Sequence, residues 1–191
     1  MKKIYIIRHA KASKSEDIDD FERKLTKSGK EDLKKLFKNL ASHEIHPDLV
    51  LSSPAVRTAK TAKKIAKFYN FDKNRICFDE RLYLCNVENL LKILQNIDDE
   101  FNEVFLVGHN PSLMELGELL SSLCLASFPT SSILCLEFDI KEFKNLKKHS
   151  GKLVFFEHVR KLKEEKDSGF LVRRLTLTSN LLYNFLVFFL L

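Results

Sequence analysis

Two arginines and two histidines in this chain follow runs of apolar, strand-forming residues. Arg8 and His9 come directly after IYII, His109 follows VFLVG, and Arg57 lies shortly after LVLS. Guanidinium groups bind phosphate oxygens through paired hydrogen bonds, and a neutral imidazole is a good nucleophile and leaving group near neutral pH. Such a set favours the binding of a phosphate group.

Each of these dipeptides is weak evidence when taken alone, because most Arg-His and Gly-His pairs are structural. Their shared position at the carboxyl ends of strands favours a site, since ligands of open α/β sheets bind at that edge. The histidines and cysteines show no HExxH motif and no CxxC pair. We therefore expect no metal and no cofactor.

The elements that must position these residues alternate between strand and helix. One helix begins at Ser28, where Ser28 and Glu31 form a capping box, and another is predicted over residues 87–97. The alternation predicts an α/β fold, a three-layer sandwich with a mostly parallel central sheet and helices on both faces. Strands are expected at residues 4–7, 48–52, 75–78, 104–107, 132–138 and 152–159.

Two further helices are predicted to begin at Ser-Pro and Asn-Pro pairs. Ser53 and Asn110 are the expected N-caps, each followed by a proline in the first turn. Arg57 and His109 would then lie at helix N-termini, where free N–H groups and the helix dipole attract phosphate. Gly108 would let the backbone approach a ligand closely.

Length and composition suggest one globular domain with an extension. The 191 residues are 45% hydrophobic and 30% charged, as in folded proteins. We assign residues 1–160 to one domain and residues 161–191 to a C-terminal extension of unknown role. Its apolar run, Leu181–Leu191, is too short for a membrane-spanning helix of about 20 residues. Only a weak membrane association of this tail is left open.

The charge and cysteine content narrow the partners and the compartment. Of the net charge of +6, residues 160–191 carry +3, so the remaining 159 residues carry only +3, and nucleic-acid binding is not expected. The apolar run near the N-terminus is too short for a signal peptide. A cytoplasmic location fits the irregularly spaced cysteines, which we expect to be buried free thiols: Cys77, Cys85, Cys124 and Cys135.

Three segments carry a family resemblance. IYIIRHAKAS, LSSPAVRTAKTA and VFLVGHNPSL resemble, in order and content, the signature segments of the histidine phosphatase superfamily, also called phosphoglycerate mutase-like. The details RHAKAS, LTKSG and DERLY are most similar to the SixA phosphohistidine phosphatase branch. The resemblance covers about residues 2–160.

The resemblance implies a role for each of the four residues. His9 would be the nucleophile that becomes phosphorylated. Arg8 and Arg57 would hold the phosphoryl oxygens, and His109 would stabilise the transferring group.

A general acid is harder to assign. Many members of the superfamily use a carboxylate, and Glu80, beside Asp79 in FDERLY, is the candidate. The alternative is a pair of surface acids at a strand end. A phosphohistidine substrate would need little help from an acid, because its P–N bond is activated.

The expected reaction is removal of phosphate from phosphohistidine on a protein, such as a phosphotransfer domain. The alternative within the superfamily is a small-molecule phosphomonoesterase or mutase. Mutases carry a long insertion that forms a lid, whereas only 51 residues separate Arg57 from His109 here. A third possibility, of another class, is a non-catalytic module that binds phosphorylated partners.

Overall fold

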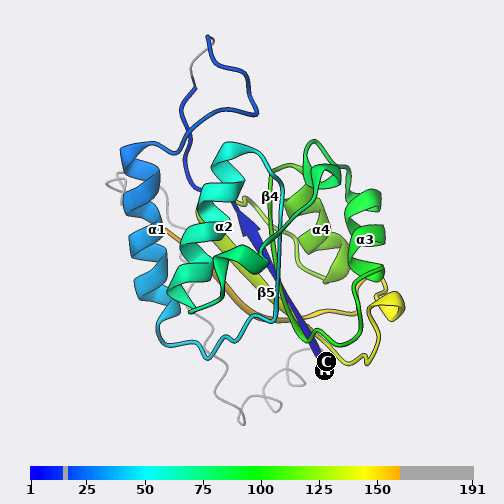
Figure 1. Ribbon diagram of the computed structural model, residues 1–191. Coiled ribbons are helices and arrows are strands. Elements are labelled where there is room, and N and C mark those ends of the chain that lie inside the picture. The colour runs from blue at the N-terminus through cyan, green and yellow to red at the C-terminus, as the bar shows by residue number, and fades with distance from the viewer. Residues whose placement is uncertain (15–16, 160–191) are drawn as a thin grey trace, which may run out of the picture. The chain divides into compact units, whose positions relative to one another are not determined.

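Six strands form one sheet in the computed structural model, which describes residues 1–14 and 17–159 (Figure 1). Their order is β3-β2-β4-β1-β5-β6. Only β5 runs against the others, since it is antiparallel to both β1 and β6. The predicted mostly parallel sheet is confirmed. The strands are β1 Lys2–Arg8, β2 Leu49–Ser52, β3 Cys77–Phe78, β4 Glu103–Gly108, β5 Ser132–Phe138 and β6 Lys152–His158.

Helices cover both faces of the sheet (Figure 1). Side chains of α1 and α2 pack into one buried cluster, and those of α3 and α4 into another. The three-layer α/β sandwich is therefore confirmed. The α-helices are α1 Lys27–Leu40, α2 Val56–Phe68, α3 Val87–Gln95 and α4 Ser112–Leu120; short 3-10 turns are η1 Lys73–Arg75, η2 Glu80–Leu82 and η3 Phe143–Asn145.

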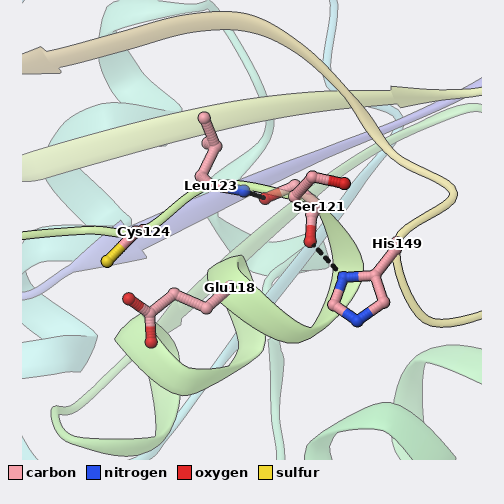
Figure 2. A pocket seen from close by; sticks show the side chains of 6 residues that line it. Glu118, Ser121, Leu123, Cys124 and His149 are labelled. Atoms are coloured by element: carbon pink, nitrogen blue, oxygen red, sulfur yellow. Dashed lines mark hydrogen bonds between the residues drawn. The ribbon is translucent and has the colours of Figure 1, made fainter.

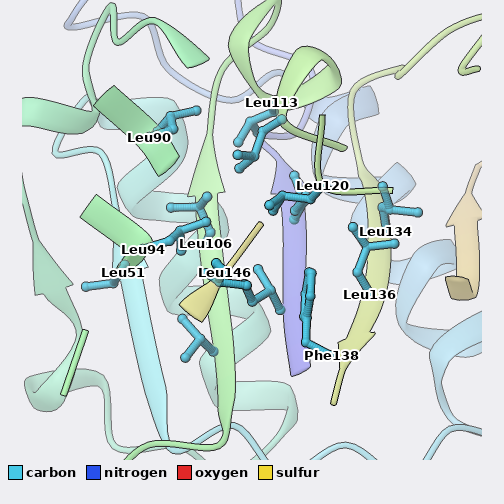
Figure 3. Packing of buried hydrophobic residues seen from close by; sticks show 14 of the residues in the cluster. Leu51, Leu90, Leu94, Leu106, Leu113, Leu120, Leu134, Leu136, Phe138 and Leu146 are labelled. Atoms are coloured by element: carbon cyan, nitrogen blue, oxygen red, sulfur yellow. The ribbon is translucent and has the colours of Figure 1, made fainter. Parts of the chain in front are cut away.

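Alternation along β1 divides its side chains between the two clusters. Ile4 and Ile6 join the leucine-rich cluster beneath α3 and α4 (Figure 3), while Tyr5 and Ile7 join the cluster beneath α1 and α2. Successive side chains of a strand point to opposite faces, and a sheet covered on both faces needs apolar residues at every position. This explains the uninterrupted run IYII before Arg8.

The start of α1 differs from the prediction, and the reason involves the segment that follows His9. Thr26, not Ser28, is the N-cap, and its Oγ1 accepts a hydrogen bond of 3.0 Å from the N–H of Gly29. The N–H of Thr26 in turn donates to the carbonyl of Lys11 at 2.9 Å. A Cβ on Gly29 would lie 2.2 Å from that same oxygen. The glycine of LTKSG therefore allows α1 to pack against Lys11.

The helices α2 and α4 also begin later than their Ser-Pro and Asn-Pro signals suggest. The N–H of Ser53 donates to the carbonyl of Val107 at 3.1 Å, which prolongs the sheet pairing, so α2 starts only at Val56. Asn110 does not cap α4. Its side-chain amide donates instead to the carbonyl of Phe128 at 3.1 Å.

The cysteine prediction was wrong for two of the four residues. Cys135 is buried in β5 and Cys85 is half-buried, but Cys77 and Cys124 are exposed. Cys77 lies in β3 at the edge of the sheet, and Cys124 lies in the loop after α4, so neither is covered by the core. All four are free thiols.

The predictions for the C-terminal extension, including Leu181–Leu191, lie outside the described residues. The domain boundary near residue 160 therefore stays a prediction. Within residues 1–14 and 17–159, no helix has the length and apolar character needed to cross a membrane.

Replacing Gly29 by Ala is expected to destabilise the fold by about 2 kcal/mol, because the new methyl group cannot coexist with the Lys11 carbonyl unless backbone moves. Urea unfolding measures the loss. Lys30→Ala, an exposed substitution one residue further along α1, is the matched control. An unchanged unfolding midpoint for the Gly29 variant would contradict this packing.

Candidate active site

Three adjacent strands end at the place where the four candidate residues meet. In the order β2-β4-β1, the carboxyl ends lead to Arg57 in the first turn of α2, to His109, and to Arg8 with His9. The N–H of His9 donates to the carbonyl of Gly108 at 3.2 Å, which continues the β1–β4 pairing by one residue. The two imidazole rings consequently lie side by side, with centroids 5.3 Å apart.

The orientation of His9 leaves one ring nitrogen available. Its Nδ1 lies 2.8 Å from the carbonyl oxygen of Ala10. A carbonyl only accepts hydrogen bonds, so Nδ1 carries the proton of the neutral ring and Nε2 keeps its lone pair. The residue is 8% exposed. His9 is therefore held in the tautomer that a nucleophile acting through Nε2 requires.

Burial keeps both histidines neutral. The pKa of His9 is lowered to about 4, mainly by burial and further by the positive charges of Arg57, Arg8 and Arg23, against the opposing hydrogen bond to the Ala10 carbonyl. Burial, followed by the charge of Arg57, lowers the pKa of His109 to about 3. Near neutral pH neither ring is protonated, so the charge available to an anion comes from the arginines.

Each arginine is anchored at its tip and keeps a buried donor free. Arg8 Nη1 donates to the carbonyl of Phe128 at 2.5 Å, and both terminal nitrogens of Arg57 donate to Asp20. Within the described part of the chain, no acceptor faces the buried Nε of Arg8, the buried Nε of Arg57 or the Nδ1 of His109. Buried donors of this kind normally have partners. These three are suited to the oxygens of a phosphoryl group.

Ser53 determines how His109 can act, and the sequence reasoning gave it only a capping role. Its Oγ lies 3.0 Å from Nε2 of His109. If the serine hydroxyl donates, Nδ1 of His109 carries the proton and can donate to a ligand oxygen. Ser53 is fully buried, and the position follows from the sheet pairing that keeps residues 53–55 out of α2.

The rim of the site contains two residues that the sequence reasoning missed. The hydroxyl of Tyr83 donates to Oδ2 of Asp20 at 2.9 Å, and the Tyr83 and His109 rings form a T-shaped pair with centroids 5.6 Å apart. Asp20 lies in a polar loop with no periodic pattern. Only the Asp-x-x-Arg spacing to Arg23, whose guanidinium binds Asp20 at 2.7 Å, could have drawn attention to it.

Glu80, the candidate acid, is the first residue of η2 and is exposed. Its carboxylate makes no hydrogen bond or ion pair with another described residue. Asp79 caps η2 by accepting from the N–H of Arg81 at 2.9 Å and pairs with the Arg81 side chain. The structure thus brings Arg8, His9, Arg57 and His109 together, and Glu80 is not part of their contact network.

Gly108 has a packing role that the sequence did not indicate, and the close approach of a ligand to its backbone stays a prediction. A Cβ at this position would meet the side chain of Leu113, with the nearest atom at 3.3 Å. The absence of a side chain therefore serves the packing of α4 against the end of β4.

A surface hollow lies at the other end of α4 (Figure 2). There, Nδ1 of His149 donates to the carbonyl of Ser121 at 2.6 Å. None of the four site residues lines this hollow. The hollow is lined by Glu118, Ser121, Ser122, Leu123, Cys124 and His149.

Across residues 1–14 and 17–159, no three His, Cys, Asp or Glu side chains group in a way that could hold a metal ion.

A protein-family model matches the part of the chain that carries these four residues. The model of the histidine phosphatase superfamily (branch 1) matches residues 4–110, more than half of the chain, and this span contains all four site residues. The chain belongs to the histidine phosphatase superfamily. The first resemblance noted from the sequence is thereby confirmed.

The chain is also similar to individual proteins in sequence and in fold. An uncharacterised chloroplastic protein of Arabidopsis thaliana is 28% identical over 129 residues, which is 63% of this chain; the chain spans 59% of that relative's length. A putative phosphohistidine phosphatase SixA of Agrobacterium tumefaciens has a TM-score of 0.68 at 25% identity, with 83% of this chain and 99% of that one covered. A SixA complexed with tungstate has a TM-score of 0.69 at 21% identity, with 82% and 96% covered.

In this histidine phosphatase superfamily member, replacing Ser53 by Ala is expected to lower kcat about fivefold with little change in KM. The variant removes the partner of His109 Nε2, and a lost hydrogen bond of this kind is worth about 1 kcal/mol. Steady-state kinetics with p-nitrophenyl phosphate provide the measurement. Ser122→Ala, an exposed serine in the hollow, is the control. Equal kcat for both variants would remove Ser53 from the mechanism.

A second prediction concerns pH and stability. The unfolded chain takes up the His9 proton near its ordinary pKa of 6.5, but the folded protein does so only near 4. The unfolded state thus binds more protons between these values, and stability falls as pH drops through this window. His9→Asn removes that contribution. Between about pH 7 and about pH 5, the free energy of unfolding of the variant should therefore fall by about 2 kcal/mol less than that of wild type.

Urea unfolding of both proteins at the two pH values tests this expectation. His46→Asn, which replaces an exposed histidine, should retain the wild-type pH dependence. A His9→Asn protein with the same pH dependence as wild type would show that His9 is not kept neutral by the fold.

Proposed function

We propose that this protein is a phosphatase that removes phosphate from phosphohistidine on another protein, through a phosphorylated His9. Membership of the histidine phosphatase superfamily supports phosphatase chemistry. The observation that carries the proposal is the neutral His9, with Nδ1 bound to the Ala10 carbonyl and Nε2 unprotonated, in the field of Arg8 and Arg57. A group in this state is ready to attack phosphorus.

The proposed reaction has two displacements. Nε2 of His9 attacks phosphorus, the P–N bond of the substrate breaks, and the departing imidazole leaves as a neutral ring once a proton is supplied. Water then attacks the phosphorus on His9, which releases inorganic phosphate and restores the histidine. Arg8 and Arg57 hold the oxygens in both steps, and His109 donates to the transferring group.

An exposed Glu80 without contacts to the site is compatible with a P–N leaving group. Protonation of the substrate imidazole at its other nitrogen can come from solvent, because that nitrogen is accessible when the ring stands on a protein surface. A phosphate ester would instead leave as a poor alkoxide and would need a placed acid. Glu80 remains the residue proposed as general acid. Its exposed position favours a substrate whose leaving group needs little protonation by the enzyme.

The segment between Arg57 and His109 also favours a protein substrate. Its residues form most of α2, then η1, β3, η2, α3 and β4, and Leu90 and Leu94 of α3 are buried in the core beneath that helix. The segment therefore contributes to the sheet and its cover, with no long insertion to close over a small ligand. A phosphoimidazole on a protein surface could enter such a site.

Several features of the proposal rest on sequence arguments. We propose that the protein acts without a metal and in the cytoplasm, on a partner such as a phosphotransfer domain. The alternative within the superfamily is a small-molecule phosphomonoesterase or mutase. The alternative of another class is a module that binds phosphorylated partners without turnover.

The expected preference is measured as kcat/KM for a histidine-phosphorylated phosphotransfer domain against 3-phosphoglycerate and a phosphoserine peptide, with EDTA present. Turnover of the phosphohistidine substrate should be fastest, and quenched reactions should contain acid-labile phosphate on wild type and none on His9→Ala.

Each contrary outcome points elsewhere. Faster turnover of 3-phosphoglycerate or the serine peptide would favour the small-molecule or ester phosphatase. Tight binding without turnover would favour the binding module, and loss of activity in EDTA with recovery in added divalent metal would refute the metal-independent mechanism.

A further inference from the structure

One carboxylate at the rim joins three segments of the chain. Asp20 accepts hydrogen bonds from Arg57 Nη2 at 2.8 Å, from Arg23 Nη1 at 2.7 Å and from the hydroxyl of Tyr83 at 2.9 Å. These donors come from α2, from the loop that precedes α1, and from the residue after η2. Charge-assisted hydrogen bonds of this kind are stronger than those between neutral groups.

Asp20 binds the guanidinium of Arg57 from one side. Its Nη1 donates to the backbone carbonyl of Asp20, and its Nη2 donates to the Asp20 carboxylate. The side chain of Arg57 is 6% exposed, and its buried Nε has no acceptor among the described residues. The terminal fork is therefore occupied, and the lateral edge, made of Nε–H and the second hydrogen of Nη2, remains for two oxygens of a ligand.

Asp20 keeps its negative charge in this position. Partial burial alone would raise the pKa of the carboxyl, but hydrogen bonds from Arg23, Tyr83 and Arg57 outweigh it and hold the pKa well below its usual range. Near neutral pH Asp20 thus has no proton to donate, and it is not a substitute for a general acid.

We propose that Asp20 is a positioning residue, which grips the terminal nitrogens of Arg57 and thereby turns the lateral edge of the guanidinium toward the phosphoryl group. The proposal rests on the function proposed above for this site. A long arginine side chain loses rotamer freedom when it binds an anion. If a partner fixes the arginine beforehand, this entropy loss does not reduce the binding of the transition state.

The same carboxylate could instead act only as a competitor of phosphate, and the two roles predict opposite signs. A negative charge beside Arg57 repels an incoming anion, so a mere competitor would weaken anion binding, and its removal would strengthen it. A positioning residue must do the reverse. The sign of the change in oxyanion affinity therefore separates the two.

The fold is expected to survive removal of the Asp20 side chain. The backbone carbonyl of Asp20 still accepts from Arg57, and the carbonyl of Phe21 still accepts from the N–H of Val56 at 3.0 Å. The Asp20 side chain itself is 46% exposed. Asp20→Ala removes the acceptor, whereas Asp20→Asn removes the charge but keeps one oxygen. Asp17→Asn, an exposed acid of the same loop without contacts to other described residues, is the matched control.

Isothermal titration with tungstate, a tetrahedral oxyanion, measures the effect on binding, and p-nitrophenyl phosphate measures kcat and KM. For Asp20→Ala we expect tungstate Kd and kcat each to worsen roughly 10- to 100-fold, in keeping with one lost charge-assisted hydrogen bond. Asp20→Asn should recover part of the loss. Asp17→Asn should match wild type, and thermal unfolding should remain cooperative in all variants.

Tungstate binding as tight as wild type, or tighter, in either Asp20 variant would overturn the positioning role and make Asp20 a competitor. Loss of cooperative unfolding in both would assign it a structural role instead. The affinity for tungstate does not depend on turnover. If wild type binds tungstate but hydrolyses no phosphohistidine, the proposed function fails while the test of Asp20 remains valid.

Discussion

The parallel pairing of β1 with β4, and of β4 with β2, is the constraint on which the site depends. Parallel strands bring their carboxyl ends to one edge of the sheet. The residues that follow these strands therefore lie close together, although they are far apart in the sequence. The register Arg8↔Gly108 then sets His9 beside His109. A slip of one residue would exchange the faces of β1 and move both rings out of reach of each other.

Burial at this edge of the sheet leaves the histidines neutral and the arginines charged. An imidazole loses its proton readily when water is removed, whereas a guanidinium stays charged. The same desolvation that leaves His9 neutral therefore strengthens the attraction between the arginines and an anion. The carbonyls of Ala10 and Phe128 and the hydroxyl of Ser53 complete this arrangement by fixing single atoms of the charged and neutral groups.

The strands and the meeting of Arg8, His9, Arg57 and His109 could be predicted from the sequence, because apolar runs mark buried strands and the position after a strand determines the edge. That Asp20 binds Arg57 could not be predicted this way. It lies 37 residues before Arg57, in a loop without periodicity, and its contacts exist only in the folded chain. The helix starts at Ser53 and Asn110 were wrong because hydrogen bonds to Val107 and Phe128 outweighed the local capping signals.

The central position of β1 in the sheet affects how the chain folds during synthesis. Its neighbours β4 and β5 lie 100 or more residues downstream, as the pairs Lys3↔Glu103 and Lys2↔Phe138 show. Contacts this distant in sequence form slowly, because a long loop must close before they can stabilise anything. On a ribosome adding about 5–20 residues per second, IYIIRH is made well before β4 and β5 and then waits unpaired for several seconds or longer. The segment that carries His9 is thus an apolar strand that needs protection from aggregation until β5 is synthesised.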